Sequence, residues 1–358
     1  MKKIKTNLKD CCIYMGYPLE KIGKKLKDKK FGEKVFILSD KNVSKLYGNI
    51  VKESIKKEGK EVFLFEIEPG ETSKNFENSY RIIKECSKFG MERIDTIASL
   101  GGGVITDLGG FVASIYLRGI NSVYIPTTLL AQVDAAIGGK TGVNLPWGKN
   151  LIGSFYQPNF VYIDLKTLFT LPSNEVTQGL AEVIKYGIIK DSGLFEFLER
   201  FDYKSIQRRY NYIVEKSIRI KVEIVEKDER EEGLREILNF GHTLGHAIEI
   251  LNLRRYNHGQ AVALGMVGET FLACKLGICK EEVLLRIINV LKRYRLPYDL
   301  REVNVTDIVE SITYDKKKKF GKLRFVLPER IGKVKRGVEI EKDFIIKKWK
   351  EMGRLWID

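Results

Sequence analysis

The stretch DTIASLGGG, residues 95–103, places a short apolar run directly before three glycines. The run predicts a buried strand over Asp95–Leu100, and the glycines predict a tight turn before a helix from about Ile105. Three further apolar runs, each expected to be a strand, alternate with helical patterns: Lys34–Ser39, Glu61–Ile67 and Ser122–Ile125. This alternation is typical of a mostly parallel sheet covered by helices, so we expect an α/β fold here.

The character of the chain changes after Leu171-Pro172-Ser173. Long amphipathic segments follow, with few strand signals: Glu175–Lys190, Leu194–Phe201, Ser205–Glu226, Arg235–Leu251, Ala261–Leu276 and Glu281–Tyr294. A short β-like tail, Leu323–Leu327 and Val334–Ile340, precedes a last helix. We therefore predict an α/β domain over residues 1–172 and a mainly α-helical domain over residues 173–358.

All three histidines of the chain lie in REILNFGHTLGHAIEILNLRRYNHG, residues 235–259. If Arg235–Leu251 is one helix, His242 and His246 project from the same face. That face would also carry a guanidinium, an amide and a carboxylate, from Arg235, Asn239 and Glu249. The opposite face would pack inward through apolar side chains: Ile237, Phe240, Leu244, Ile248 and Leu251.

Two or three imidazoles with a carboxylate can hold a catalytic metal ion. The spacing equally allows two helix histidines and one loop histidine with no ligand role. It is not the HExxH pattern of metalloproteases, because Thr243 stands where the glutamate is needed. Glu182 is a carboxylate that could complete a metal site, although an ion pair with Lys185 in the same helix explains it as well.

Composition limits the function classes. We expect no membrane span and no signal peptide, since no long apolar run occurs. Five scattered cysteines predict reduced thiols in a cytoplasmic protein. The formal net charge of +15 suits either nucleic acid or a phosphorylated or carboxylated substrate. The lysine patch Lys316–Lys319 has no basic helix beside it, which favours a solvated loop over a nucleic-acid site.

Three features suit a nucleotide or another phosphorylated ligand. Gly101–Gly103 would present backbone N–H groups and a helix N-terminus to a phosphate, although they match neither GxGxxG nor a P-loop, and a packed turn is the alternative. Asp40 ends the first predicted strand, where a ribose hydroxyl is often held, but a helix N-cap explains it equally. Lys140, Lys149 and Asn150 lie in a glycine-rich, loop-like region and could bind an anion or face solvent.

Six segments that occur in order resemble the 3-dehydroquinate synthase family: GGGVITDLGGFVASIYLRG, IPTTLLAQVDAAIGGKTGVN, KNLIGSFYQP, GLAEVIKYG, LNFGHTLGHAIE and HGQAV. The match runs from about Asp40 to Leu327. The resemblance implies a dinucleotide-binding α/β domain, a helical metal- and substrate-binding domain and an active site in the interdomain cleft. It also implies a homodimer in which Arg118 reaches the neighbouring subunit's site.

The resemblance further implies the site residues. The ligands of Zn²⁺ or Co²⁺ would be Glu182, His242 and His258. NAD would be bound by Asp40, Asn42, Glu71, Lys74, Gly102, Gly103, Val104, Asp107, Thr127, Thr128, Lys140, Lys149, Thr167, Leu168 and Leu171. Substrate binding and catalysis would use Arg118, Asp134, Lys140, Asn150, Lys185, Arg235, Asn239, His246 and Lys322, with His246 moving protons.

The implied reaction converts 3-deoxy-D-arabino-heptulosonate 7-phosphate to 3-dehydroquinate and phosphate. It runs through transient oxidation by NAD, phosphate loss, re-reduction, ring opening and aldol closure. The alternatives are an inosose-type sugar-phosphate cyclase and a metal- and NAD-dependent polyol-phosphate dehydrogenase. Two positions depart from the family pattern. Gln260 stands where a glutamate is usual and could weaken a contact to a ligand histidine, and Thr106 replaces a frequent glycine.

Overall fold

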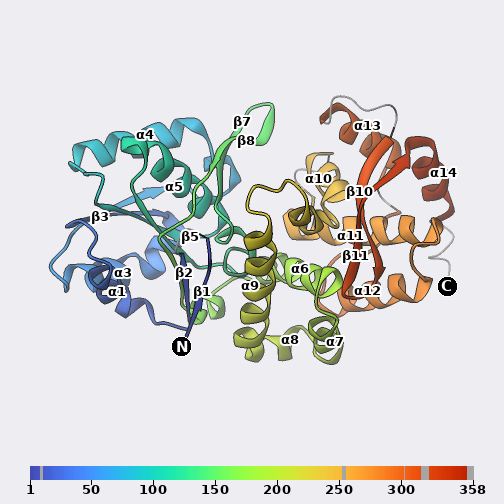
Figure 1. Ribbon diagram of the computed structural model, residues 1–358, viewed down its shortest axis with the longest axis horizontal. Coiled ribbons are helices and arrows are strands. Elements are labelled where there is room, and N and C mark those ends of the chain that lie inside the picture. Colours follow the sequence, from blue (N-terminus) through green and yellow to red (C-terminus); the bar gives the residue numbers. More distant parts are fainter. Residues whose placement is uncertain (9–10, 252–254, 302, 316–321, 353–358) are drawn as a thin grey trace. The chain divides into compact units, whose positions relative to one another are not determined.

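The computed structural model describes residues 1–8, 11–251, 255–301, 303–315 and 322–352. These residues form two compact units (Figure 1). The first comprises Met1–Pro172 and Lys221–Glu229, and the second comprises Ser173–Ile220 and Arg230–Asp358. The domain prediction placed Lys221–Glu229 in the second domain, but the structure places it in the first unit. The reason is that the last part of helix α9 (Tyr210–Lys227) packs with the first unit.

The first unit contains a seven-stranded sheet in the order β1-β2-β9-β6-β5-β3-β4. Only β1 and β2 pair antiparallel, so the expected mostly parallel α/β sheet is confirmed. The strands are β1 (Lys2–Lys5), β2 (Cys12–Met15), β3 (Lys34–Asp40), β4 (Glu61–Ile67), β5 (Thr96–Gly101), β6 (Asn121–Pro126) and β9 (Phe160–Ile163). Strands β1, β2 and β9 were not anticipated from the sequence, since their apolar runs are short.

Both faces of this sheet are covered by helices. The helices are α1 (Ile22–Asp28), α2 (Lys41–Val43), α3 (Asn49–Lys56), α4 (Phe76–Lys88) and α5 (Gly103–Ile115). Val35 and Ile37 of β3 pack in one core with Val51 and Ile55 of α3. The alternate residues Phe36 and Leu38 belong to the core that contains residues of α4 and α5. A parallel sheet buried on both faces needs such continuous apolar strands, which is why KVFILS predicted the strand well.

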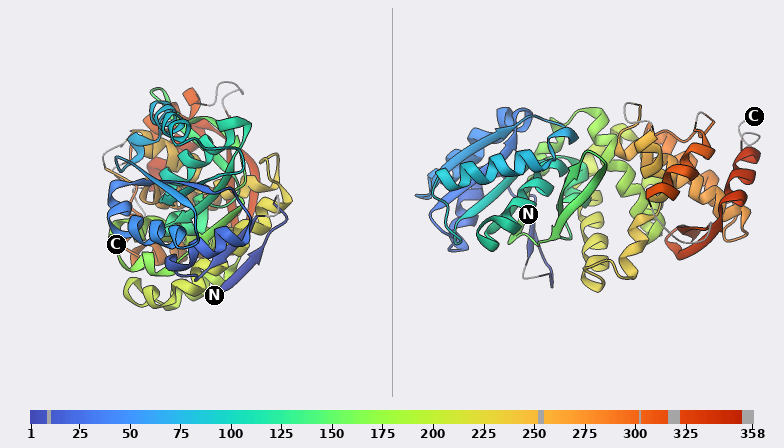
Figure 2. Two further views of the ribbon diagram at one scale, coloured as in Figure 1. Left: turned by 90° about the vertical axis from the view of Figure 1, so that its left-hand side faces the viewer. Right: turned by 90° about the horizontal axis from the view of Figure 1, so that it is seen from above.

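The second unit is mainly helical (Figure 2, green to red). Its elements are α6 (Ser173–Ile189), α7 (Ser192–Arg200), α8 (Tyr203–Ile206), the first part of α9, α10 (His242–Leu251), α11 (His258–Lys275), α12 (Glu281–Arg293), α13 (Val305–Asp315), α14 (Lys342–Met352) and the hairpin of β10 (Lys322–Arg330) and β11 (Lys333–Glu341). Helix α11 contacts α6, α10 and α12. It is apolar around nearly its whole circumference, as a central buried helix requires.

Two local predictions were wrong. Arg235–Leu251 is not one helix: a 3-10 turn, η8 (Leu234–Asn239), ends before α10, and Gly241 at φ +79° separates them. Arg235 and Asn239 therefore do not share a helical face with His242, and Leu251 is 44 % exposed rather than turned inward. Lys140, Lys149 and Asn150 lie on the hairpin of β7 (Lys140–Leu145) and β8 (Gly148–Phe155), not in a loop.

Two further expectations concern membrane spans and the lysine patch. Within the described ranges, no helix combines the length and the apolarity needed to cross a membrane. The lysine patch Lys316–Lys319 lies outside the described residues.

Helices α10 and α11 approach each other backbone to backbone through glycine. A Cβ atom on Gly265 would lie 1.9 Å from the carbonyl oxygen of Gly241, and one on Gly245 would lie 3.0 Å from that of Ala261. Since backbone atoms cannot move aside like a flexible side chain, only glycine fits at Gly265.

We predict that Gly265→Ala lowers the free energy of unfolding of the second unit by about 1–3 kcal/mol through overpacking. The matched control is Gly193→Ala in α7, where the nearest neighbour is the flexible Asp191 side chain at 3.2 Å. Alanine should be neutral or slightly stabilising there, because it is the better helix former. Urea unfolding followed by circular dichroism measures both, and equal stability of the two variants would contradict the packing argument.

Candidate metal centre and nucleotide-binding edge

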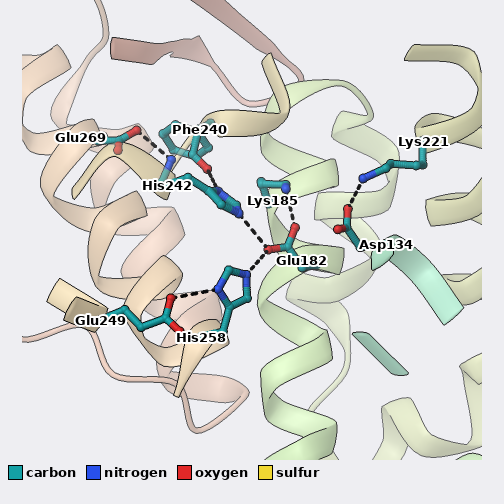
Figure 3. A network of polar contacts seen from close by, with 10 residues as sticks. Asp134, Glu182, Lys185, Lys221, Phe240, His242, Glu249, His258 and Glu269 are labelled. Carbon is teal, nitrogen blue, oxygen red and sulfur yellow. Dashed lines mark hydrogen bonds and ion pairs between the residues drawn. The ribbon is translucent and has the colours of Figure 1, made fainter. Parts of the chain in front are cut away.

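Glu182, His242 and His258 meet in the second unit, although each comes from a different helix (Figure 3). Their ligand atoms all lie within 4.8 Å of one another. The Nε2 atom of His242 lies 3.5 Å from Oε1 of Glu182, and Nε2 of His258 lies 3.7 Å from the same oxygen. His242 opens α10, His258 opens α11, and Glu182 lies within α6. The structure thus brings together the three residues that the resemblance implied as metal ligands.

Both ligand histidines are held through their other ring nitrogen. Nδ1 of His242 lies 3.1 Å from the carbonyl oxygen of Phe240, and Nδ1 of His258 lies 3.3 Å from Oε2 of Glu249. An acceptor at Nδ1 assigns the proton to that nitrogen and leaves the lone pair of Nε2 for a cation. Two imidazoles and one carboxylate form a donor set that fits Zn²⁺ or Co²⁺.

The cluster holds groups of opposite charge close together. Glu182 is 0 % exposed and forms an ion pair with the buried Lys185 of the same helix. The ion pair that the sequence suggested as an alternative to a ligand role is therefore present, and Glu182 faces the two histidines as well. Burial holds the pKa of His242 well below 6.5, and the nearby Lys185 ammonium lowers it further. Burial also disfavours the charged form of His258, but hydrogen bonds and attraction from Glu182 and Glu249 outweigh it and raise its pKa to about 9. Positive charge is therefore favoured at His258 and disfavoured at His242.

His246 lies beside the three ligands without joining them. It is exposed, one turn along α10, and its ring centroid is 5.2 Å from that of His242. It lines a small open pocket of about 50 Å³ in the second unit, together with His242, Thr243, Ala247, Ile250, Ser311 and Ile312. An imidazole on an open pocket next to the candidate metal site is suitably placed for proton transfer.

Other predicted substrate residues of the second unit differ in their surroundings. Arg235 is 1 % exposed on η8, and Asn239 donates from Nδ2 to Oε1 of Glu231 at 2.9 Å. Lys322 is exposed on β10, where its ammonium lies 3.3 Å from Glu341. The contact of Asn239 with Glu231 was not predicted from the sequence, because Asn239 lies in a 3-10 turn where a helix was predicted.

The two departures from the family pattern have local roles. Gln260 forms a capping box with Asn257 at the start of α11, in which each backbone N–H is bound by the other side chain at 3.0 Å. Its amide is thus used at the helix terminus, while Glu249 holds His258. Thr106 is buried in the first turn of α5, and its hydroxyl donates to the carbonyl of Gly103 at 3.1 Å.

In the first unit, Asp40 ends strand β3, and Gly102 directly follows the carboxyl end of the neighbouring strand β5. From β3 the chain adds β4 on one side and then β5 on the other, so these ends form a topological switch point, where α/β sheets bind ligands. Gly102 is the N-cap of α5 and offers no side chain there, which leaves the first amides of the helix to a phosphate. The carboxylate of Asp40 accepts from the N–H groups of Asn42 and Val43, so the N-cap alternative also holds.

Three predicted nucleotide residues come together nearby. The buried Lys74 ammonium lies 2.8 Å from Asp107 and 3.6 Å from Glu71. Burial works against the charge of Lys74, but Asp107 and Glu71 outweigh it and raise its pKa above the ordinary value. Burial raises the pKa of Asp107, and Lys74 opposes that shift.

The remaining predicted residues of the first unit either bind other parts of the chain or lie at its surface. Thr128 accepts from the N–H of Ala131 at 3.1 Å, and Thr167 accepts from Gln132 at 3.0 Å. Asp134 lies 2.6 Å from the buried Lys221, which sequence reasoning missed because α9 carries it over from the second domain. The buried members are Thr127 and Leu168, the half-buried ones Val104, Gly103 and Leu171, and the exposed ones Asn42, Arg118, Lys140, Lys149 and Asn150.

Comparison with known proteins identifies the family. Residues 64–178 match the family model described as 3-dehydroquinate synthase N-terminal, and residues 179–318 match 3-dehydroquinate synthase C-terminal. The chain belongs to the 3-dehydroquinate synthase family. A relative of that name from Caldanaerobacter subterraneus subsp. tengcongensis is 47 % identical over 90 % of this chain and 92 % of its own.

Two solved structures are similar throughout. The 2-epi-5-epi-valiolone synthase from Streptomyces hygroscopicus subsp. jinggangensis, with NAD⁺ and Zn²⁺ bound, is 26 % identical at a TM-score of 0.87, covering 99 % of this chain and 98 % of its own. A 2-deoxy-scyllo-inosose synthase complexed with carbaglucose-6-phosphate, NAD⁺ and Co²⁺ is 23 % identical at a TM-score of 0.88, covering 98 % and 99 %. At that identity the second similarity shows the fold alone.

We predict that Glu249→Gln weakens Zn²⁺ binding by about 10–100-fold while leaving the fold intact, because the neutral amide holds Nδ1 of His258 less well. Competition with a chromophoric chelator measures the affinity. Glu236→Gln is the control, since it removes an ion pair of the same unit, with Arg324 at 2.9 Å, away from the ligands. Unchanged Zn²⁺ affinity in Glu249→Gln would show that Glu249 does not support His258.

Proposed function

We propose that the chain is an enzyme that converts 3-deoxy-D-arabino-heptulosonate 7-phosphate to 3-dehydroquinate and phosphate. This is a carbon–oxygen lyase reaction of the shikimate pathway of aromatic amino acid biosynthesis. The supporting observation is the Glu182, His242 and His258 cluster in a chain 47 % identical to a curated 3-dehydroquinate synthase. The arrangement suits this chemistry, because a divalent cation beside a histidine on an open pocket can activate a hydroxyl and move its proton.

Two cofactors complete the proposal. NAD would bind at the carboxyl ends of β3 and β5 and Zn²⁺ or Co²⁺ at the three ligands. When bound, NAD⁺ supplies a reversible hydride acceptor, and the cation supplies polarisation of the substrate oxygen. Because the proposed reaction is redox-neutral overall, NADH should not accumulate.

The chain's own residues would bind and orient the anionic substrate. Lys185 and Arg235 are nearly fully buried cations in the second unit, so they act where water screens charge weakly. We assign the substrate carboxylate to Arg235 and Asn239, and negative charge near the metal to Lys185. His246 would hold and return the proton of the reacting hydroxyl. Asp134, Lys140, Asn150 and Lys322 stay predicted substrate residues.

The other sugar-phosphate cyclases and a polyol-phosphate dehydrogenase remain the competing activities, and one assay separates them. Phosphate release and absorbance at 340 nm would be followed together with the heptulosonate phosphate and NAD⁺, before and after chelation. The proposal predicts phosphate without net NADH, lost with chelator and restored by Zn²⁺. NADH rising with turnover would indicate a dehydrogenase, and turnover only of other sugar phosphates would indicate another cyclase.

We also propose a homodimer formed through the first unit. Large apolar side chains are exposed beside the predicted cross-subunit residue Arg118, at Ile115 and Leu117. The β7–β8 hairpin of the same unit exposes Trp147, Leu151 and Phe155. Exposed apolar surface of this kind often marks an interface. The cytoplasmic location stays a prediction, supported by the five cysteines, which are all free thiols.

We predict that His246→Ala keeps bound Zn²⁺ but lowers kcat by about 10²–10⁴-fold, the usual contribution of a general acid or base. His242→Ala is the matched comparison on the same helix and should lose the metal itself. Zinc content by atomic absorption and steady-state rates measure the two effects. Wild-type rates in His246→Ala would remove its proposed role in proton transfer.

A further inference from the structure

Glu269 is a fully buried carboxylate of α11 that faces the start of α10. Its Oε2 accepts from the N–H of Gly241 at 2.7 Å, and its Oε1 accepts from the N–H of Leu244 at 3.1 Å. The side chain is 0 % exposed. Both oxygens thus bind the first turn of the helix that begins with His242, and Figure 3 shows Glu269 on the far side of His242 from Glu182.

The start of α10 needs an acceptor from elsewhere in the chain. The first N–H groups of any helix have no partner within it and are usually capped by a local polar side chain. Here the preceding residues are Phe240 and Gly241, and neither side chain can accept a hydrogen bond. The carboxylate of Glu269 supplies the acceptor from α11, and its negative charge suits the positive end of the helix dipole.

This contact links the positions of the two histidine ligands. His258 is the first residue of α11, and Glu269 follows it on the same helix by about three turns. His242 lies between the two residues, Gly241 and Leu244, whose amides Glu269 binds. The glycine contact of Gly265 with Gly241 sets how closely the helices approach, while the two hydrogen bonds of Glu269 set how far α10 can slide along α11.

We propose that Glu269 is a positioning residue for the metal centre: it fixes His242 relative to His258 through the first turn of α10. The inference rests on the proposed function only in requiring that Glu182, His242 and His258 bind a divalent cation.

Glu269→Gln tests the inference. The amide keeps the size of the side chain but presents an NH₂ group to one of the two backbone N–H groups, so that hydrogen bond is lost. We expect Zn²⁺ affinity to fall by about 10–100-fold and the visible absorption bands of the Co²⁺-loaded protein to shift. Glu269→Asp, which keeps the charge but is one methylene shorter, should recover part of the affinity.

The matched control is Thr270→Val. Thr270 is the next residue of α11, is equally buried, and donates to the carbonyl of Met266 at 2.6 Å within its own helix. It should lower thermal stability without changing Zn²⁺ affinity or the Co²⁺ spectrum. An unchanged spectrum and affinity in Glu269→Gln, with or without a loss of stability, would overturn the positioning role. Failure of the wild-type protein to bind Co²⁺ would instead refute the proposed metal centre.

An independent observation concerns Cys274 and Cys279. Their Sγ atoms lie 3.3 Å apart at the carboxyl end of α11, and both side chains are partly exposed. Gly277 at φ +69° turns the chain back, with N–H bonds from Gly277 to Cys274 and from Ile278 to Ala273 at 3.0 and 2.9 Å. The hydrogen bond from Cys279 lowers the pKa of Cys274, whereas burial raises the pKa of Cys11 and Cys86 to about 12.

We infer that Cys274 and Cys279 form an oxidisable dithiol that closes to a disulfide with a disulfide oxidant such as glutathione disulfide. The thiolate of Cys274 attacks one glutathione sulfur and releases the first glutathione thiolate. Cys279 then attacks the mixed disulfide and releases the second, so two thiols are oxidised and one glutathione disulfide is reduced.

Incubation of the full chain with glutathione disulfide, followed by alkylation and mass spectrometry, tests this inference. The expected product has lost two hydrogen atoms, carries no glutathione and leaves Cys274 and Cys279 unalkylated. Cys279→Ser should stop at a single glutathione adduct. A stable adduct on the wild-type chain, or two fully alkylated thiols, would overturn the inference.

Discussion

The backbone contact between α10 and α11 is the constraint on which the candidate metal site depends. At Gly265 a single added carbon would meet the Gly241 carbonyl oxygen at 1.9 Å, so the two helices touch where His242 begins one of them. Helix α6 approaches α11 in the same manner, since a Cβ on Gly259 would lie 2.4 Å from the carbonyl oxygen of Gln178. Gly259 directly follows His258. Glycine packing therefore brings three helices, each with one ligand, close enough for their ligand atoms to meet.

Polar contacts then orient side chains that packing has only brought near. Phe240 and Glu249 hold the Nδ1 atoms, so both Nε2 atoms face Glu182. Lys185 partly balances the charge of Glu182 within α6. Burying Glu182, Lys185 and two imidazoles together costs desolvation that their mutual attraction only partly offsets. The arrangement is therefore easier to explain as a preformed metal site than as a source of stability.

Much of the fold could be predicted from the sequence, because its signals are local. Lys34–Ser39 and Glu61–Ile67 form strands within one residue of the prediction, since a buried parallel strand is a continuous apolar run. The break at Gly241 could not be predicted, because apolar and polar residues keep a helical period on both sides of it. The hairpin that contains Lys140 was also missed. Its glycines suggest a loop, but β7 and β8 pair with each other, and such pairing leaves no local sequence signal.

Some residues of the candidate site could likewise be predicted from the sequence, and others could not. Clustering of all three histidines in one stretch, together with the family motifs, pointed to Glu182, His242 and His258 before any geometry was known. Glu269 and Lys221 could not be found so, because their partners lie 25 or more residues away in the chain and one carboxylate or ammonium among many carries no local pattern. Glu249 had a weak signal, the shared helix face with His242.

The most direct test of the account is zinc K-edge X-ray absorption on the wild-type protein loaded with one equivalent of Zn²⁺. The account predicts two imidazole nitrogens and a carboxylate oxygen at about 2.0–2.2 Å, with the remaining position filled by solvent. Sulfur scattering at about 2.3 Å, or the shell of a hydrated ion without imidazole, would contradict it.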